Sequence, residues 1–310
     1  MKRKVLLSIV AVLLATTGAL AQQLPQFTQY MFNPYAFNPA VGGTFNYYQV
    51  KMNNRFQWVG LKDAPQSYNL SVYGPHGSKD MGFGGNFFHD VTGPTGRTSG
   101  QASYSYNMQL TENGLRISGG VSLGFLMFRI DGSRFEFADD FIEGDPAVYR
   151  NAKAIFTPDA SVGIYVYDTR MYAGISAYQL LGQSLYRSKL SIEGDEEDFY
   201  GINRLRQHFM LMGGILLPLN RDFIIEPSVL VKYTFNTPIQ VDINAKVTYR
   251  NQFWGGLSFR WQDGVSLLVG YEHQKRYVFG YSFDYPITPL RKYSAGSHEI
   301  MLGFIFDKLK

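Results

Sequence analysis

The chain contains no cysteine in its 310 residues, which excludes disulfide bonds, thiolate metal sites and cysteine nucleophiles. Charged residues are also scarce, at 17 %, whereas aromatic residues reach 16 % and there are 32 glycines. Beyond the N-terminus, no window has the 18 or more apolar residues that a membrane-spanning helix needs. Only helices and closed barrels satisfy their backbone polar groups in lipid. If this chain resides in a membrane, it must therefore cross as a closed β-barrel.

Motifs for catalysis or metal binding are absent as well. None of the five histidines has a histidine four residues further on, so no zinc-protease motif exists. His89-Asp90 could suggest hydrolysis, but no Gly-x-Ser-x-Gly motif accompanies the pair. Residues 193–198 hold five carboxylates, yet without the spacing of a calcium loop, and we interpret them as a solvated external loop. We expect no enzymatic activity, and we predict no catalytic, metal-binding or cofactor-binding residues.

The N-terminus has the pattern of a signal peptide. Residues 2–4 are Lys-Arg-Lys, residues 5–14 are apolar, and residues 19–21 read Ala-Leu-Ala, a small-x-small cleavage site. Gln22 stands where a lipoprotein would carry cysteine. Removing residues 1–21 takes away three of the 29 basic residues and none of the 25 acidic ones, so the formal charge falls from +4 to +1. We therefore predict export, and the charge gives no support for nucleic-acid binding.

Long alternating segments follow. In residues 115–130 one face carries apolar side chains such as Val121 and Leu123, and the other carries small or polar ones such as Ser118 and Gly120. This alternation exceeds ten residues, the length that a tilted strand needs to cross a bilayer. Roughly fourteen such segments occur, near residues 46–57, 67–74, 81–91, 99–110, 115–130, 159–168, 171–181, 206–217, 222–235, 239–250, 252–262, 265–274, 276–286 and 297–307. An even number of strands is typical of bacterial outer-membrane barrels.

The connections between these segments alternate in length. Every second connection is short and turn-like, at residues 77–80, 111–114, 168–170, 219–221, near 251 and 274–276. The opposite set holds two long insertions, residues 131–157 and 182–205, and the segment 288–297. Outer-membrane barrels combine short periplasmic turns with long external loops in this way. The sequence thus predicts an all-β outer-membrane barrel of about 14 antiparallel strands over residues 45–310.

Residues 22–44 do not alternate. Asn33-Pro34 and Asn38-Pro39 recur at a spacing of five, each preceded by phenylalanine, and Asn-Pro is a turn signal. Such a density of aromatic side chains would be poorly solvated in an inert linker. We therefore expect a compact, plug-like N-terminal extension that packs into or beneath the barrel.

Together, QFTQYMFNPYAFNPAVGG, the later Arg55-Phe56-Gln57-Trp58-Val59-Gly60 and Ala64-Pro65 resemble the opening of the PorP/SprF family. Members are outer-membrane proteins of the type IX secretion and gliding machinery of Bacteroidetes-type bacteria. The resemblance implies partners among the periplasmic ring lipoproteins, the translocon, and exported cargo or an adhesin. It also suggests a set of plug or partner-docking residues: Gln26, Phe27, Tyr30, Asn33, Pro34, Asn38, Pro39, Arg55 and Trp58.

Arg55 and Trp58 have two interpretations. Tryptophan is common at membrane interfaces and arginine suits a polar lumen, but either residue could instead contact the extension or a partner. For the whole protein, the resemblance implies a component that anchors or docks the secretion machine in the outer membrane. A passive diffusion channel is the alternative, since it needs only an open polar lumen.

Overall fold

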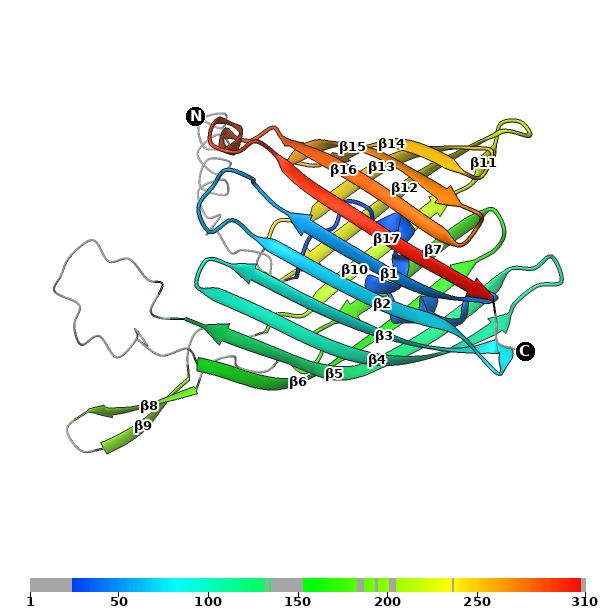
Figure 1. Cartoon of the computed structure of the whole chain (residues 1–310). Helices are drawn as coiled ribbons and strands as arrows, with labels where there is room; N and C mark the ends of the chain where they lie inside the picture. The colour runs from blue at the N-terminus through cyan, green and yellow to red at the C-terminus, as the bar shows by residue number, and fades with distance from the viewer. Residues whose placement is uncertain are drawn as a thin grey trace, which may run out of the picture.

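The computed structural model describes residues 24–131, 134, 153–182, 187–192, 195–200, 205–235 and 237–307. The expected signal peptide and the acidic residues Asp139, Asp140, Glu143, Asp145 and Glu193 lie outside the described residues. Fourteen strands form the wall, as Figure 1 shows: β1 (Tyr47–Phe56), β2 (Gln66–His76), β3 (Ser78–Thr92), β4 (Thr95–Gln109), β5 (Arg116–Ile130), β6 (Lys153–Tyr167), β7 (Met171–Tyr178), β10 (His208–Ile215), β12 (Phe223–Thr234), β13 (Gln240–Tyr249), β14 (Phe253–Arg260), β15 (Gly264–His273), β16 (Tyr277–Pro286) and β17 (Ser297–Asp307).

The wall closes on itself. Neighbouring strands pair antiparallel around the barrel, β7 pairs with β10, and β10 pairs with β12. The last strand, β17, pairs with β1 over its full length, from Tyr47 opposite Asp307 to Phe56 opposite His298. Each of the fourteen predicted segments overlaps one of these strands, so the prediction of a closed barrel of about 14 strands is confirmed.

The apolar and polar side chains that alternate in the sequence lie on opposite faces of the barrel wall. In β5, Val121 and Leu123 point outward and are 55 % and 70 % exposed, whereas Ser118 and Ser122 point inward and are buried. In β17, Ile300, Leu302 and Phe304 point outward likewise. Outward apolar and inward polar side chains are the arrangement that a barrel in lipid requires. Among the described residues, no helix is both long and apolar enough to span a bilayer.

The two ends of the barrel differ in their connections. Both β1 and β17 meet the end with short turns, where a single residue, Gly77, links β2 to β3 in a left-handed conformation with φ +63°. In another short turn, Asp168 accepts hydrogen bonds from the backbone N–H groups of Arg170 and Met171, which lower the pKa of its carboxyl group. We call this the short-turn end, and the opposite one the long-loop end.

Three strands start three or more residues earlier than predicted. β3 begins at Ser78 instead of residue 81, β4 at Thr95 instead of residue 99, and β6 at Lys153 instead of residue 159. The early part of β6 contains Pro158, although proline cannot donate a ladder hydrogen bond. β7 pairs with β6 only from Val162 onward, so Pro158 lies on an edge of β6 that β7 leaves unpaired.

The second long insertion contains a hairpin that was not predicted. β8 (Arg187–Ile192) and β9 (Asp195–Tyr200) pair with each other and form a sheet separate from the barrel, so the acidic run is partly strand and not a plain loop. A two-residue strand, β11 (Leu217–Pro218), pairs with the start of β12. The short 3-10 helix η5 (Pro289–Lys292) lies in the connection before β17.

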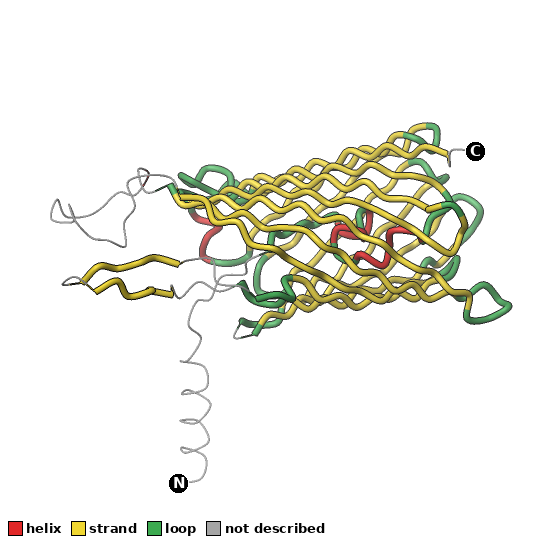
Figure 2. The backbone as a smooth tube through the Cα atoms, turned by 90° about the horizontal axis from the view of Figure 1, so that it is seen from below, coloured by secondary structure: helices red, strands yellow, loops and turns green. Residues whose placement is uncertain are grey.

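The extension folds into three short 3-10 helices inside the barrel, shown in red within the strands in Figure 2: η1 (Tyr30–Phe32), η2 (Pro34–Ala36) and η3 (Pro39–Gly43). The repeated Asn-Pro motif accounts for two of them. Pro34 and Pro39 occupy the first helical position, where a missing N–H costs nothing. Asn38 caps η3, because its side chain accepts a hydrogen bond from the N–H of Ala40.

Candidate functional site: the extension inside the barrel

The extension, of which the structure describes residues 24–44, runs through the lumen from the long-loop end to the short-turn end. Leu24 lines a cavity at the long-loop mouth together with Trp58 and Gln262. Further along, Thr28 contacts Arg55, whereas the carbonyl of Phe32 contacts Lys51, four residues nearer the start of β1. Residues 27–43 are buried, apart from three half-buried side chains. The extension therefore fills the barrel core that strands alone would leave open.

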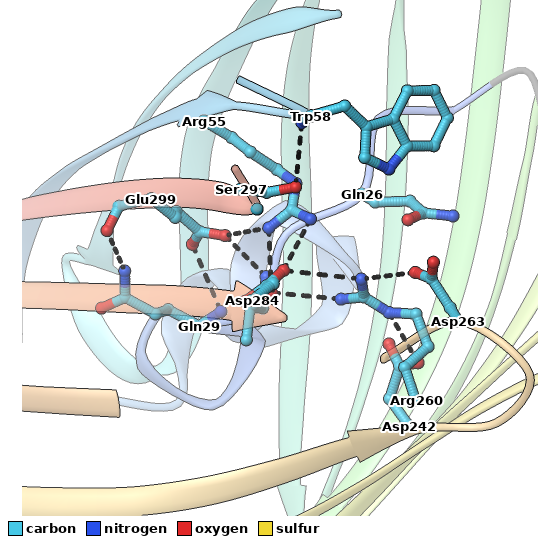
Figure 3. Close-up of polar contacts among 12 residues, drawn as sticks. Gln26, Gln29, Arg55, Trp58, Asp242, Arg260, Asp263, Asp284, Ser297 and Glu299 are labelled. Atoms are coloured by element: carbon cyan, nitrogen blue, oxygen red, sulfur yellow. Dashed lines mark hydrogen bonds and ion pairs between the residues drawn. The ribbon is translucent and has the colours of Figure 1, made fainter. Parts of the chain in front are cut away.

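Near the long-loop end, charged side chains from several strands converge on Thr28. Arg55 contacts Asp284 at 2.6 Å and donates to the Thr28 hydroxyl at 3.0 Å. Arg260 donates to the same hydroxyl at 3.1 Å, and the hydroxyl donates to Asp284 at 2.8 Å (Figure 3). The Glu299 carboxylate accepts hydrogen bonds from the backbone N–H groups of Thr28, at 2.6 Å, and Gln29, at 3.2 Å.

The charged side chains of this cluster are almost fully buried. The side chains of Arg55 and Glu299 are 2 % and 0 % exposed, and Arg260 is also buried and pairs with Asp242 at 3.1 Å. Buried charges are stable only when each is paired and its remaining hydrogen bonds are satisfied. Because Thr28 and Gln29 supply several of those hydrogen bonds, the extension is part of the charge cluster and not merely adjacent to it.

The middle of the extension is held by amides and aromatic rings. Asn33 donates to Asn53 at 3.0 Å and to Ser71 at 3.0 Å, from β1 and β2 respectively. Tyr35 donates to or accepts from Ser103 at 2.7 Å, and its ring stacks on that of Tyr73 with centroids 4.6 Å apart. Side chains from three different strands thus fix η1 and η2 against one side of the wall.

Around η3, the wall presents glycine where the extension's backbone comes closest. A Cβ atom on Gly120 would lie 2.5 Å from the Cα of Ala40, and one on Gly174 would lie 2.7 Å from the Asn38 amide nitrogen. Added Cβ atoms on Gly82 and Gly163 would also overlap the extension. Only glycine permits such a close approach. The amide of Asn38 then donates to the carbonyls of Ile164 and Ile175, at 3.0 and 3.2 Å.

The structure brings most of the residues from the family motif together inside the lumen. Seven of them lie on the extension, and six of those are buried: Phe27, Tyr30, Asn33, Pro34, Asn38 and Pro39. Gln26 is half-buried and donates to Gln240 at 3.1 Å. Arg55 faces the lumen and also contacts the extension through the Thr28 hydroxyl.

Trp58 lies apart from this group. It is half-buried at the long-loop mouth, beside Gln26 in Figure 3, and its backbone N–H donates to Ser297 at 3.1 Å. Its φ of +50° is a left-handed conformation that is unfavourable for a bulky residue. The surrounding structure must therefore impose this conformation.

The hydrolytic pair and the metal sites considered in the sequence analysis do not form in the described part of the structure. His89 points outward and contacts Thr98, whereas Asp90 is the next residue on β3, points inward and accepts from Ser67. The two side chains therefore form no dyad. Within the described part of the chain, no group of three or more histidine, aspartate or glutamate side chains is placed to hold a metal ion.

The sequence did not point to Thr28, Asp242, Arg260, Asp284 or Glu299. Each of the four charged residues does lie on the inward face of its alternating strand, which was the available signal. Which of them would meet the extension could not be known, because Thr28 and Glu299 are 271 residues apart.

Removing Arg55 should destabilise the barrel strongly. Arg55→Met leaves Asp284 and Glu299 buried with fewer cationic partners, and we expect the free energy of unfolding to fall by about 3–5 kcal/mol. The control, Arg116→Met, removes a pair with Asp80 that is largely exposed, and should cost about 0–1 kcal/mol. Urea unfolding in lipid vesicles measures both, and equal losses would contradict the structural role of the cluster.

Two adjacent glycines test the fit between wall and extension. Gly120→Ala places a methyl group against Ala40, so we expect a loss of about 1–3 kcal/mol from overpacking. Gly119→Ala, on the outward face of the same strand, meets nothing within 4 Å and should be tolerated. The same unfolding measurement compares them. If the two variants behave alike, the extension does not occupy the position described.

The direction of the extension can be read by labelling, since the chain has no native cysteine. With the long loops outside, as in outer-membrane barrels, Leu24→Cys and Gln262→Cys should react with a membrane-impermeant maleimide on intact cells. Asn113→Cys, in an exposed short turn, should react only after the outer membrane is permeabilised. Leu24→Cys behaving like Asn113→Cys would reverse the direction assigned to the extension.

Comparisons with known proteins agree with this architecture. The model of the family described as "Type IX secretion system membrane protein PorP/SprF" matches residues 19–304. A search of curated proteins returned no match. Among solved structures, the fold is similar to the "CymD monoaromatic hydrocarbon channel", with a TM-score of 0.51 and 12 % identity over 94 % of this chain and 96 % of that one. It is also similar to the Ralstonia pickettii toluene transporter TbuX, with a TM-score of 0.52 and 9 % identity over 89 % and 93 %.

At such low identities the structural neighbours establish the fold alone, an outer-membrane barrel. The family match covers nearly the whole chain and implies interaction with other type IX secretion components. The family and the fold resemble channels and secretion components without enzymatic activity. This chain is an outer-membrane β-barrel and belongs to the PorP/SprF family of type IX secretion system membrane proteins.

Proposed function

We propose that this protein is a non-enzymatic anchor of the type IX secretion machinery, occluded by its own N-terminal extension. Residues 1–21 would be removed as a signal peptide, residues 22–44 would form the plug, and residues 45–310 the barrel. The observation that carries the proposal is the seating of Thr28 and Gln29 in the buried charge cluster of Arg55, Asp284 and Glu299.

A plug is the role that fits the motif residues best. A segment meant to dock a soluble partner would keep its recognition side chains accessible. Here Tyr30, Asn33 and Asn38 are each at most 1 % exposed and are bonded to the wall. We therefore assign docking of the periplasmic ring lipoproteins and the translocon to the short turns, and contact with exported cargo or an adhesin to the long-loop end.

A passive diffusion channel is the second candidate, because the fold is similar to that of proteins described as hydrocarbon channels. A channel needs a continuous lumen. In this barrel the backbone of η3 lies directly against the inward-facing glycines of β3 and β5, and the side chains of Asn38 and Pro39 lie against the glycine of β6. This close packing favours the occluded anchor.

Loss of the gene should change protein export. We expect large exported proteins to accumulate in the periplasm of a deletion strain, or one surface adhesin to be missing, when its secreted and surface proteomes are compared with those of the parent. Many retained proteins would indicate a general component, and one missing adhesin a dedicated adaptor. A deletion strain that differs only in the uptake of small solutes would contradict the proposal and support the channel.

A further inference from the structure

The short-turn end, at the right in Figure 2, carries exposed basic side chains on one side. They lie in the connections β6–β7, β10–β12, β13–β14 and β15–β16. We call the following five residues the cationic arc: Arg170, Arg221, Arg250, Lys275 and Arg276. The same four connections hold only two acidic residues, so five basic against two acidic residues give a formal charge of +3. The two turns on the other side, residues 77–80 and 111–114, together hold one basic and two acidic residues.

Backbone hydrogen bonds join these connections into one continuous strip along the rim. The N–H of Leu216 donates to the carbonyl of Arg170 at 2.6 Å, and the N–H of Arg250 donates to the carbonyl of Asp222 at 2.7 Å. The turn at residues 250–252 is joined in the same way to the end of β15. The members of the cationic arc are therefore neighbours in space, although they are spread over about a hundred residues of sequence.

The acidic residues close by do not neutralise the cationic arc. Asp222 pairs with Arg250 at 3.1 Å, and both side chains are largely exposed. Asp168 accepts hydrogen bonds from two backbone N–H groups of its own turn. Glu272, near the end of β15, faces the lumen. Within the described part of the chain, the other four members of the arc form no ion pair.

An aromatic row lies on the outer face of the wall directly beside the arc. Phe223, Tyr249, Phe253 and Tyr271 are successive cross-strand neighbours on β12 to β15. The rings of the first two are 4.9 Å apart between centroids, and those of the last two are 4.7 Å apart. Outward aromatic residues of membrane barrels lie at the level of the lipid headgroups. Arg250 directly follows Tyr249, and its guanidinium lies 5.1 Å from the centre of that ring, so the arc lies at the headgroup level.

We propose that the cationic arc binds the phosphate groups of anionic phospholipids in the adjacent leaflet. Guanidinium and ammonium groups donate charge-assisted hydrogen bonds to phosphate oxygens, and basic residues at a membrane surface attract anionic lipid. The turns at residues 168–170, 250–252 and 274–276 are only three residues long, which keeps their side chains beside the aromatic row. This position favours lipid headgroups over an acidic protein beyond the membrane. The bound lipids hold one side of the barrel to the leaflet, whatever the role of the protein in secretion.

The first test needs no variant. Native mass spectrometry of the full chain in a nonionic detergent compares dioctanoyl phosphatidylglycerol with dioctanoyl phosphatidylcholine, which has the same acyl chains and no net charge. We expect the anionic lipid to bind at least about tenfold tighter, and the difference to shrink as salt is added, because exposed charges are screened. Equal affinities would overturn the proposal and favour an acidic protein as the partner of the arc.

A third probe separates lipid from free phosphate. sn-Glycerol 3-phosphate has the charged part of the headgroup without acyl chains, and we expect it not to bind at the concentrations that saturate the anionic lipid. If it binds as tightly as the lipid, the arc is a site for free phosphate and the assignment to the membrane is wrong.

The second test assigns the lipid to the arc with two matched double variants. Lys275→Gln with Arg276→Gln removes two adjacent exposed charges from the arc and should weaken binding of the anionic lipid at least about tenfold, while binding of the neutral lipid is unchanged. Arg291→Gln with Lys292→Gln removes two adjacent exposed charges at the long-loop end and should bind as the parent does. If both double variants, migrating as folded barrels in unheated gels, lose equal affinity or lose none, the arc is not the lipid site.

Discussion

The buried ion pairs around Thr28 are the interaction on which the rest of this structure depends. A barrel of fourteen strands lies between the small barrels that side chains fill and the open porins, and Arg55, Arg260, Asp284 and Glu299 all point into its lumen. Left to themselves these charges would have unsatisfied hydrogen-bonding groups in a nearly dry interior. The hydroxyl and backbone of Thr28, with the backbone of Gln29, supply several of the hydrogen bonds that these charges need, so that barrel and extension stabilise each other.

The inner surface of the wall also accommodates the extension around η3, nearer the short-turn end. Glycine occupies the inward positions where η3 approaches, and the side-chain amide of Asn38 donates to the wall carbonyls of Ile164 and Ile175. Hydrogen bonds and ion pairs hold the extension near the long-loop end, and close packing against glycines holds it nearer the short-turn end. A barrel whose lumen is filled in this way fits the proposed role of an anchor in the outer membrane.

Much of the fold was accessible from the sequence, because alternation is a local signal that each outer-membrane strand carries in its own residues. Errors arose where the local signal was weak. The start of β6 lay within a segment that was interpreted as a long loop, and the charged residues of β8 and β9 concealed a hairpin. The Asn-Pro motif located the extension, since capping and turn chemistry are also local. Its contacts with Asp284 and Glu299 were not accessible, because they join residues more than 250 positions apart.

The most direct test of the occluded barrel is single-channel conductance in planar bilayers, measured for the mature chain and for the same chain lacking residues 24–44. If the extension seals the lumen, the intact protein passes almost no current, and the shortened one, where it inserts as a folded barrel, gives a large and stable conductance. A large, stable conductance from the intact protein would contradict the account and identify the barrel as an open channel.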